Sequence, residues 1–288
     1  MRQRMNPEER RERRRRVVAR SKFALPSAVT LLSVLCGFSS VVMSINAAGD
    51  KTGVNFLWAA GLLLAAGVFD GLDGRIARAT NTATEFGVQL DSLADVLSFG
   101  MAPAILAYRY GFFDLGLADP RLRAVGWGAS FFFVACGALR LARFNVQVGF
   151  VDSRFFMGMP IPAGAACVAA VILCWPEAPT HAWMAYLFAA ELFLVGLLMV
   201  STVRFPSFKK RSSSPNTTKW TTIVLLLVLS MVPVLREQFF LAFFGAFIVV
   251  SLALNLGWRL GWRGIEPPIK ERRHHPEDGP AEEGLEPQ

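Results

Sequence analysis

Long apolar runs separated by short polar segments dominate the pattern along this 288-residue chain. A helix of about 20 apolar residues is long enough to cross the hydrocarbon core of a bilayer. The pattern therefore predicts an all-α, polytopic integral membrane protein with about eight transmembrane helices. The expected spans cover approximately 25–48, 54–78, 88–110, 124–146, 160–176, 182–203, 220–236 and 238–257.

Changes in composition divide the chain into three parts. Residues 1–22 form a strongly basic segment, and residues 23–257 contain all of the apolar runs. Residues 258–288 are rich in Pro, Glu and Gly, a composition that is typical of disorder. We expect a transmembrane catalytic domain over 23–257. A basic cytoplasmic segment precedes this domain, and a disordered cytoplasmic tail follows it.

The basic residues are distributed very unevenly between the two sides of the predicted membrane domain. With the N-terminus inside, 25 of the 30 Lys and Arg residues fall in inside segments. Cytoplasmic loops carry such an excess, so both termini are predicted to be cytoplasmic in a multi-pass protein of the inner cell membrane. Attraction of the basic segment to anionic lipid explains the net charge of +8 without a nucleic-acid partner.

Four aspartates interrupt the second and third apolar runs near the short polar turn that joins them. Asp70 and Asp73 are three residues apart, and Asp91 and Asp95 are four apart, so each pair shares a helix face. Carboxylates at a membrane edge are costly unless a cation neutralises them. Oxygen ligands without nearby His or Cys favour Mg²⁺ or Mn²⁺. We expect these four aspartates to hold two divalent ions, a pair suited to clamping a diphosphate.

The residues around the aspartates suit a nucleotide. Gly74 and Gly87 leave the helix surface bare, so a flat base can lie against the backbone. Arg78 is placed to pair with phosphate oxygens. The same glycines also suit close helix packing, and the same arginine suits anchoring at the membrane surface.

The spacing D-x2-D-G-x2-A-R-x8-G-x3-D-x3-D resembles the signature of the CDP-alcohol phosphatidyltransferases. It is met by Asp70, Asp73, Gly74, Ala77, Arg78, Gly87, Asp91 and Asp95. The resemblance implies a dinuclear metal site, a CDP-linked lipid donor, an alcohol acceptor and a homodimer. It also implies that Asp95 is the general base, besides being a metal ligand.

Further positions are assigned to the CDP portion of the donor by the same resemblance. Gly74, Arg78 and Thr84 match family positions that hold this portion, and we place Gly87 with them. The family often opens its first span with Pro-Asn-x-x-Thr. Here Ser27 replaces the Asn, whereas Thr30 fits the pattern.

Three other stretches resemble the members of the family that use CDP-diacylglycerol as donor and L-serine as acceptor. They cover 92–104, 135–146 with the following 155–166, and 198–210. The resemblance implies transfer of a phosphatidyl group to the serine hydroxyl. An arginine fork can bind the serine carboxylate. The candidate serine contacts are Ser98, Arg140, Arg143 and Asn145.

Two other functions are compatible with parts of the pattern. Within the family, glycerol 3-phosphate is an alternative acceptor, which would give phosphatidylglycerol phosphate, although its phosphate calls for a denser basic cluster. A transporter is the rival outside the family, because intramembrane aspartates also bind coupling cations. Transporters usually place such sites near the bilayer midplane, whereas these aspartates lie near the cytoplasmic edge.

Overall fold

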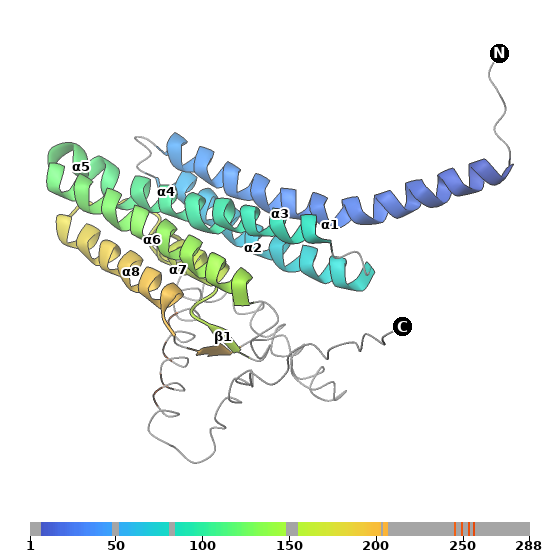
Figure 1. Ribbon diagram of the computed structural model, residues 1–288. Coiled ribbons are helices and arrows are strands. Elements are labelled where there is room, and N and C mark those ends of the chain that lie inside the picture. The colour runs from blue at the N-terminus through green and yellow to red at the C-terminus, as the bar shows by residue number, and fades with distance from the viewer. Residues whose placement is uncertain are drawn as a thin grey trace, which may run out of the picture.

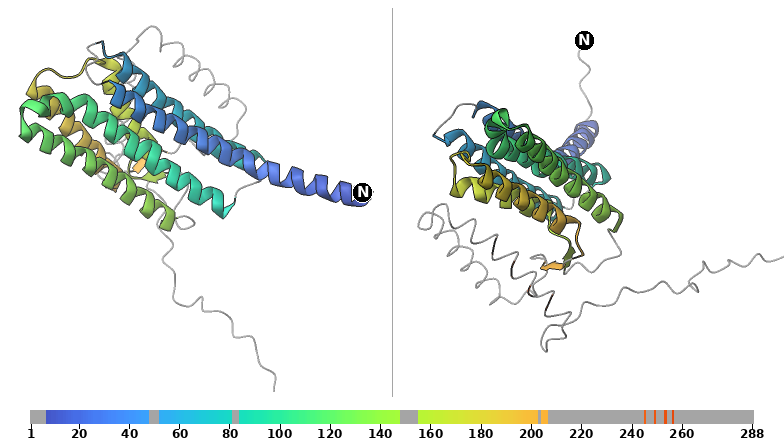
Figure 2. Two further views of the ribbon diagram at one scale, coloured as in Figure 1. Left: turned by 90° about the horizontal axis from the view of Figure 1, so that it is seen from above. Right: turned by 90° about the vertical axis from the view of Figure 1, so that its left-hand side faces the viewer.

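The computed structural model describes residues 7–47, 52–80, 84–147, 155–202 and 204–206, with four isolated residues at 245, 249, 253 and 256. Long helices lie side by side in a bundle, and the N-terminal part of α1 extends beyond it (Figures 1 and 2). The helices are α1 (Pro7–Asn46), α2 (Val54–Thr80), α3 (Glu85–Asp95), η1 (Val96–Met101), α4 (Ala102–Tyr108), η2 (Arg109–Phe113), α5 (Asp114–Ala118), α6 (Pro120–Gln147), α7 (Ile161–Cys174) and α8 (Ala182–Val200). The two strands are β1 (Phe155–Met157) and β2 (Arg204–Pro206).

The described part of the chain confirms a helical, multi-pass membrane protein. Five helical segments are long and apolar enough to cross a bilayer: Pro26–Asn46, Val54–Ala77, Glu85–Ala118, Pro120–Val146 and Ala182–Val200. The span predicted at 160–176 corresponds to α7, an apolar helix of only 14 residues.

The last two predicted spans, 220–236 and 238–257, lie outside the described residues apart from the four isolated positions, and so does the tail 258–288. The count of eight spans and the three-part division of the chain therefore stay predictions.

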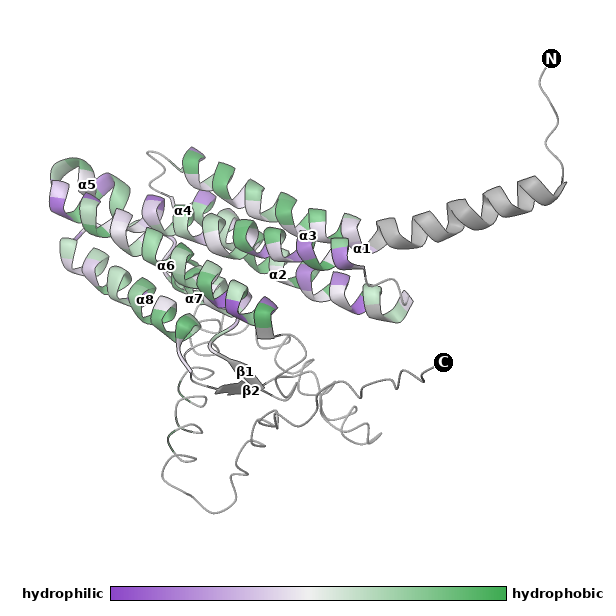
Figure 3. Cartoon of the chain, in the orientation of Figure 1, coloured by the Kyte–Doolittle hydropathy of each residue, from purple (hydrophilic) through white to green (hydrophobic). Residues whose placement is uncertain are grey.

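The outer surface of the bundle is apolar, as lipid contact requires. Phe38 and Trp58 are each 65% exposed, on α1 and α2. Most of the helical ribbon is coloured as hydrophobic residues, and hydrophilic bands lie on α2 and α3 at the end of the bundle from which α1 extends and on α5 at the other end (Figure 3). The polar residues therefore lie mainly toward the ends of the helices.

Helices α1 and α2 pack closely through small residues and interhelical hydrogen bonds. Ser33 Oγ donates to the Ala66 carbonyl at 3.0 Å, and Ser40 Oγ donates to the Ala59 carbonyl at 2.8 Å. Both alanines are fully buried, which lets the two backbones approach. This packing fixes the rotation of α2, and with it the direction in which its aspartates point.

The third span is one continuous helix with two π-helical segments, η1 and η2. In η1 the N–H of Ala102 bonds to the carbonyl of Leu97, five residues earlier, which is the wider π pattern. The π segment begins directly after Asp95. It therefore changes which residues of the span face the same side as that carboxylate.

A short two-stranded ribbon forms from β1, which precedes α7, and β2, which follows α8. Strand β1 pairs antiparallel with β2, and Phe156 lies opposite Phe205. The turn after β1 uses Gly158 at φ +77°, where an added Cβ would lie 2.1 Å from the Met199 carbonyl oxygen. The N–H of Met159 then bonds to the Leu198 carbonyl at 3.0 Å. The ribbon joins two of the stretches that resemble serine-using enzymes, 155–166 and 198–210.

Candidate active site at the membrane edge

Three of the four predicted aspartates converge between α2 and α3. One carboxylate oxygen from each of Asp70, Asp91 and Asp95 lies within 4.8 Å of the other two. Helix α3 is oriented by its N-cap, because Thr84 Oγ1 accepts a hydrogen bond from the Gly87 N–H at 3.0 Å. The four-residue spacing places Asp91 and Asp95 on one side of α3, where they meet Asp70 of α2, whereas the prediction included Asp73 as well.

Asp73 has a different environment. It is 5% exposed and accepts a hydrogen bond from Thr30 Oγ1 at 2.6 Å, so its carboxylate is tied to α1. The cluster of three within 4.8 Å does not include Asp73. A role for Asp73 as a metal ligand stays a prediction, with Thr30 as the residue that orients it.

The cluster fits a divalent cation. Three carboxylates at this separation repel one another unless positive charge lies between them. Asp95 Oδ1 is buried and has no hydrogen-bond partner among the described residues, so this oxygen is available as a ligand. All three side chains offer oxygen, which matches the preference of Mg²⁺ and Mn²⁺. Asp70, Asp91 and Asp95 form an acidic site that suits a metal ion of this kind.

The predicted nucleotide contacts come from α1, from the end of α2 and from the beginning of α3. Ser27 is half-buried one turn before Thr30 on α1, and Gly74 directly follows Asp73 on α2. The side chain of Arg78 lies outside the described part of the chain.

Thr84 and Gly87 both have a structural role in the cap of α3, where a Cβ on Gly87 would lie 3.2 Å from Thr84 Oγ1. Contact of these residues with CDP stays a prediction.

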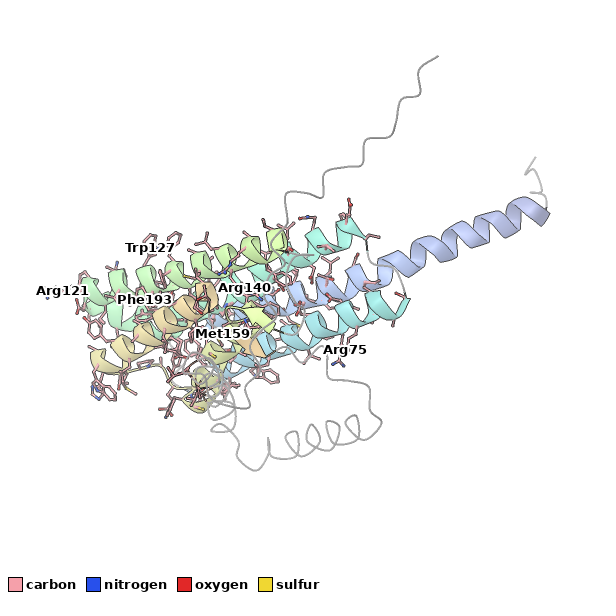
Figure 4. The ribbon with its side chains drawn as sticks, turned by 60° about the horizontal axis from the view of Figure 1, so that its bottom comes forward. Arg75, Arg121, Trp127, Arg140, Met159 and Phe193 are labelled. Atoms are coloured by element: carbon pink, nitrogen blue, oxygen red, sulfur yellow. The ribbon has the colours of Figure 1, made fainter. Side chains whose placement is uncertain are left out.

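The four candidate serine contacts fall into two groups. Ser98 and Arg140 are buried, with 1% and 7% exposure, and Arg140 lies close enough to Asp95 for electrostatic interaction. Arg140 lies among the packed helices, whereas Arg75 points away from the bundle (Figure 4).

The other two candidates have protein partners. Arg143 Nη1 donates to the Val200 carbonyl at 3.4 Å, and Asn145 Nδ2 donates to Ser92 Oγ at 3.0 Å. Ser92 was not among the predicted site residues, although it opens the stretch 92–104. It ties the end of α6 to the helix that carries Asp91 and Asp95.

Comparison with known families identifies the class of protein. Residues 23–195 match the model of the CDP-alcohol phosphatidyltransferase family. The chain belongs to this family of membrane transferases, so the transporter alternative is excluded.

The relatives carry more specific names. The chain is 37% identical over 212 residues to the CDP-diacylglycerol–serine O-phosphatidyltransferase of Helicobacter pylori, covering 72% of this chain and 79% of the relative. It is 34% identical over 184 residues to the enzyme of the same name from Methanocaldococcus jannaschii, covering 64% and 74%. It is also 34% identical over 188 residues to the archaetidylserine synthase of Methanothermobacter thermautotrophicus, covering 65% and 71%.

Proposed function

We propose that this protein transfers the phosphatidyl group of CDP-diacylglycerol to the hydroxyl of L-serine, giving phosphatidylserine and CMP. The observation that carries the proposal is the convergence of Asp70, Asp91 and Asp95 in a chain of this family. The names of the relatives support serine as the acceptor rather than glycerol 3-phosphate. The reaction belongs to phospholipid biosynthesis.

Two divalent ions, Mg²⁺ or Mn²⁺, are the proposed cofactors. Asp70, Asp73, Asp91 and Asp95 are the residues that would hold them. When bound, such ions neutralise the diphosphate and stabilise the charge that develops on the departing phosphate. Thr30 contributes by holding Asp73 in one orientation through the 2.6 Å hydrogen bond.

Different residues of the chain bind the donor and take the proton from the acceptor. Ser27, Thr30, Gly74, Arg78, Thr84 and Gly87 are the proposed contacts for the CDP portion of the donor. Asp95 takes the proton from the serine hydroxyl. The serine oxygen then bonds to the phosphorus that carries diacylglycerol, while the bond from that phosphorus to the oxygen of CMP breaks. Since no covalent enzyme intermediate is involved, both substrates bind before either product leaves.

The orientation and assembly belong to the proposal as well. The distribution of Lys and Arg supports a site on the cytoplasmic side of the inner membrane, with both termini on that side. The ends of α2 and the beginning of α3, which carry the aspartates, then lie at the cytoplasmic edge. Membrane lipid surrounds the protein, and a homodimer is the proposed assembly.

The proposal is tested with purified protein in detergent, supplied with CDP-diacylglycerol and Mn²⁺. CMP release is followed with L-serine, with glycerol 3-phosphate and without acceptor. Release that needs both serine and metal supports the proposal. Release with glycerol 3-phosphate alone would keep the family chemistry and overturn the acceptor. No release with either acceptor, in folded protein, would overturn the proposed reaction.

A further inference from the structure

The first part of α1 is a strongly basic helix that leaves the bundle. We call residues 7–22 the basic arm, because eight basic and three acidic residues give them a net charge of +5. At a rise of 1.5 Å per residue, the arm is about 24 Å long. It extends from the end of the bundle where α2 ends and α3 begins (Figures 1 and 2). The match to the family model starts at residue 23, so the arm lies outside the part that this match covers.

The same helix leads from the arm to the aspartates. Thr30 of α1 donates the 2.6 Å hydrogen bond to Asp73 of α2, and α1 also contacts α3. Lys22, the last basic residue of the arm, lies eight positions before Thr30, which corresponds to about 12 Å along a helix. In 0.1 M salt, charges are screened over about 10 Å. The positive charge of the arm therefore begins about one screening length from the site.

The sequence of the arm favours a partner that is recognised by charge. A helix that embeds in a membrane surface carries an apolar stripe at helical spacing. In the arm the apolar residues Val17, Val18 and Ala19 are consecutive, and so are the four arginines at 13–16, so neither kind forms such a stripe. On the proposed cytoplasmic side, the phosphates of the lipid headgroups are the negative charges closest to the start of a span.

We infer that the basic arm gathers CDP-diacylglycerol from the surrounding leaflet beside the aspartate site. The inference rests on the proposed function and orientation, and adds how the donor is recruited. The diphosphate of CDP-diacylglycerol carries more negative charge than the headgroup of phosphatidylglycerol, and phosphatidylcholine carries no net charge. A cluster of charge raises the local concentration and the encounter rate of an oppositely charged substrate. The arm therefore favours the donor over the other lipids of the leaflet.

A general attraction to any anionic lipid, which would only anchor the arm, is the simpler role. The two roles are separated in vesicles of phosphatidylcholine, where the donor is the only anionic lipid. The arm variant carries Arg14→Gln, Arg15→Gln and Arg16→Gln. The matched control removes the same charge from the tail, which lies outside the described residues, by Lys270→Gln, Arg272→Gln and Arg273→Gln.

The first measurement is kcat/KM for CDP-diacylglycerol in these vesicles, with its mole fraction varied at saturating L-serine and Mn²⁺. We expect the arm variant to lower kcat/KM by roughly 10-fold at low ionic strength, with kcat and the serine KM unchanged. The difference should disappear in 1 M salt, where the screening length falls to about 3 Å. The tail variant should behave as the wild type. Added phosphatidylglycerol should lower the wild-type value toward that of the arm variant, because this lipid competes for the arm.

A second measurement reports recruitment without turnover. A dye on Val17→Cys in the arm transfers energy to acyl-labelled CDP-diacylglycerol in the same vesicles. Three of the four native cysteines are buried and Cys36 is partly buried, so the introduced thiol reacts most readily. We expect more transfer to the labelled donor than to labelled phosphatidylcholine at the same mole fraction. Most of this excess should be lost in the arm variant and in 1 M salt.

Several results would overturn the inference. Unchanged kcat/KM in the arm variant would do so, and an equal loss in the tail variant would attribute the effect to overall charge. A lower melting temperature or a lower kcat in the arm variant would assign the arm to the fold. Activation of the wild type by phosphatidylglycerol would make the arm a general anchor. Wild-type protein that releases no CMP would instead refute the proposed function, and energy transfer from the arm would still decide the inference.

Discussion

The hydrogen bond from Thr30 to Asp73 allows a direct test of whether Thr30 orients Asp73 as a metal ligand. It joins α1 to α2, is 2.6 Å long and is buried, and its acceptor is a carboxylate. Thr30→Val has nearly the same shape but no hydroxyl. A hydrogen bond to a charged group contributes about 1.5–3 kcal/mol, and loss of the partner that orients a metal ligand costs about 10- to 100-fold in metal affinity or activity.

The assay is the dependence of CMP release on Mn²⁺ at saturating donor and serine. We expect Thr30→Val to need roughly 10- to 100-fold more Mn²⁺ for half-maximal activity, with activity recovering when the metal is saturating. Ser33→Ala is the matched control, one turn along the same helix. Its hydroxyl also reaches α2, but it bonds to the Ala66 backbone carbonyl and not to a carboxylate. That variant should lose only about 0.6 kcal/mol of stability and keep its metal dependence.

Two results would contradict this reasoning. Wild-type Mn²⁺ dependence in Thr30→Val would show that Asp73 does not need Thr30 to serve the metal, or that it is not a ligand. A raised KM for CDP-diacylglycerol with normal metal dependence would leave Thr30 as a nucleotide contact only, with no role in orienting Asp73 for the metal. An equal change of metal dependence in Ser33→Ala would attribute the effect to the packing of α1 on α2.

Three further variants test other parts of the account. Asp95→Asn should abolish CMP release while CDP with Mn²⁺ still stabilises the protein against heat; normal turnover would remove Asp95 as the base. Ser98→Ala should raise the serine KM about tenfold without lowering the melting temperature, because its hydroxyl has no described partner to lose; a lower melting temperature with normal KM would make Ser98 structural. Gly158→Ala should destabilise the protein by about 1–3 kcal/mol, because the φ of Gly158 is +77° and a Cβ there would meet the Met199 carbonyl. Gly128→Ala is the control and should not destabilise the protein, because a Cβ on Gly128 has open space. Equal melting temperatures for the two variants would refute this prediction.

Local spacing was enough to predict the convergence of Asp70, Asp91 and Asp95. The four-residue interval sets the face of α3, and only a few residues separate the end of α2 from the start of α3, so both determinants are visible in the sequence. The environment of Asp73, by contrast, could not be predicted from local spacing. Its partner Thr30 is 43 residues away on another helix, and only the packing of α1 against α2 brings them together.

The course of the helices also depended on contacts that local patterns do not contain. The apolar run predicted a span starting near residue 25, which agrees with the apolar segment Pro26–Asn46, but it did not predict that helix α1 begins at Pro7 and continues through Pro26. The π-helical segment η1 contains Gly100 and is followed by Pro103, but neither residue by itself specifies a π turn, so the apolar pattern did not predict it. Strands β1 and β2 have three residues each, too short for an alternating pattern to be recognised.

The central claim is that this membrane-edge aspartate cluster supports metal-dependent transfer of a phosphatidyl group to serine. The most direct measurement is incorporation of radiolabelled L-serine into lipid by the purified wild-type protein, with CDP-diacylglycerol, before and after removal of divalent metal. The account predicts labelled phosphatidylserine and an equal amount of CMP with Mn²⁺ or Mg²⁺, and neither product once the metal is chelated. Labelled lipid formed at the same rate without metal, or CMP formed without labelled lipid, would contradict it.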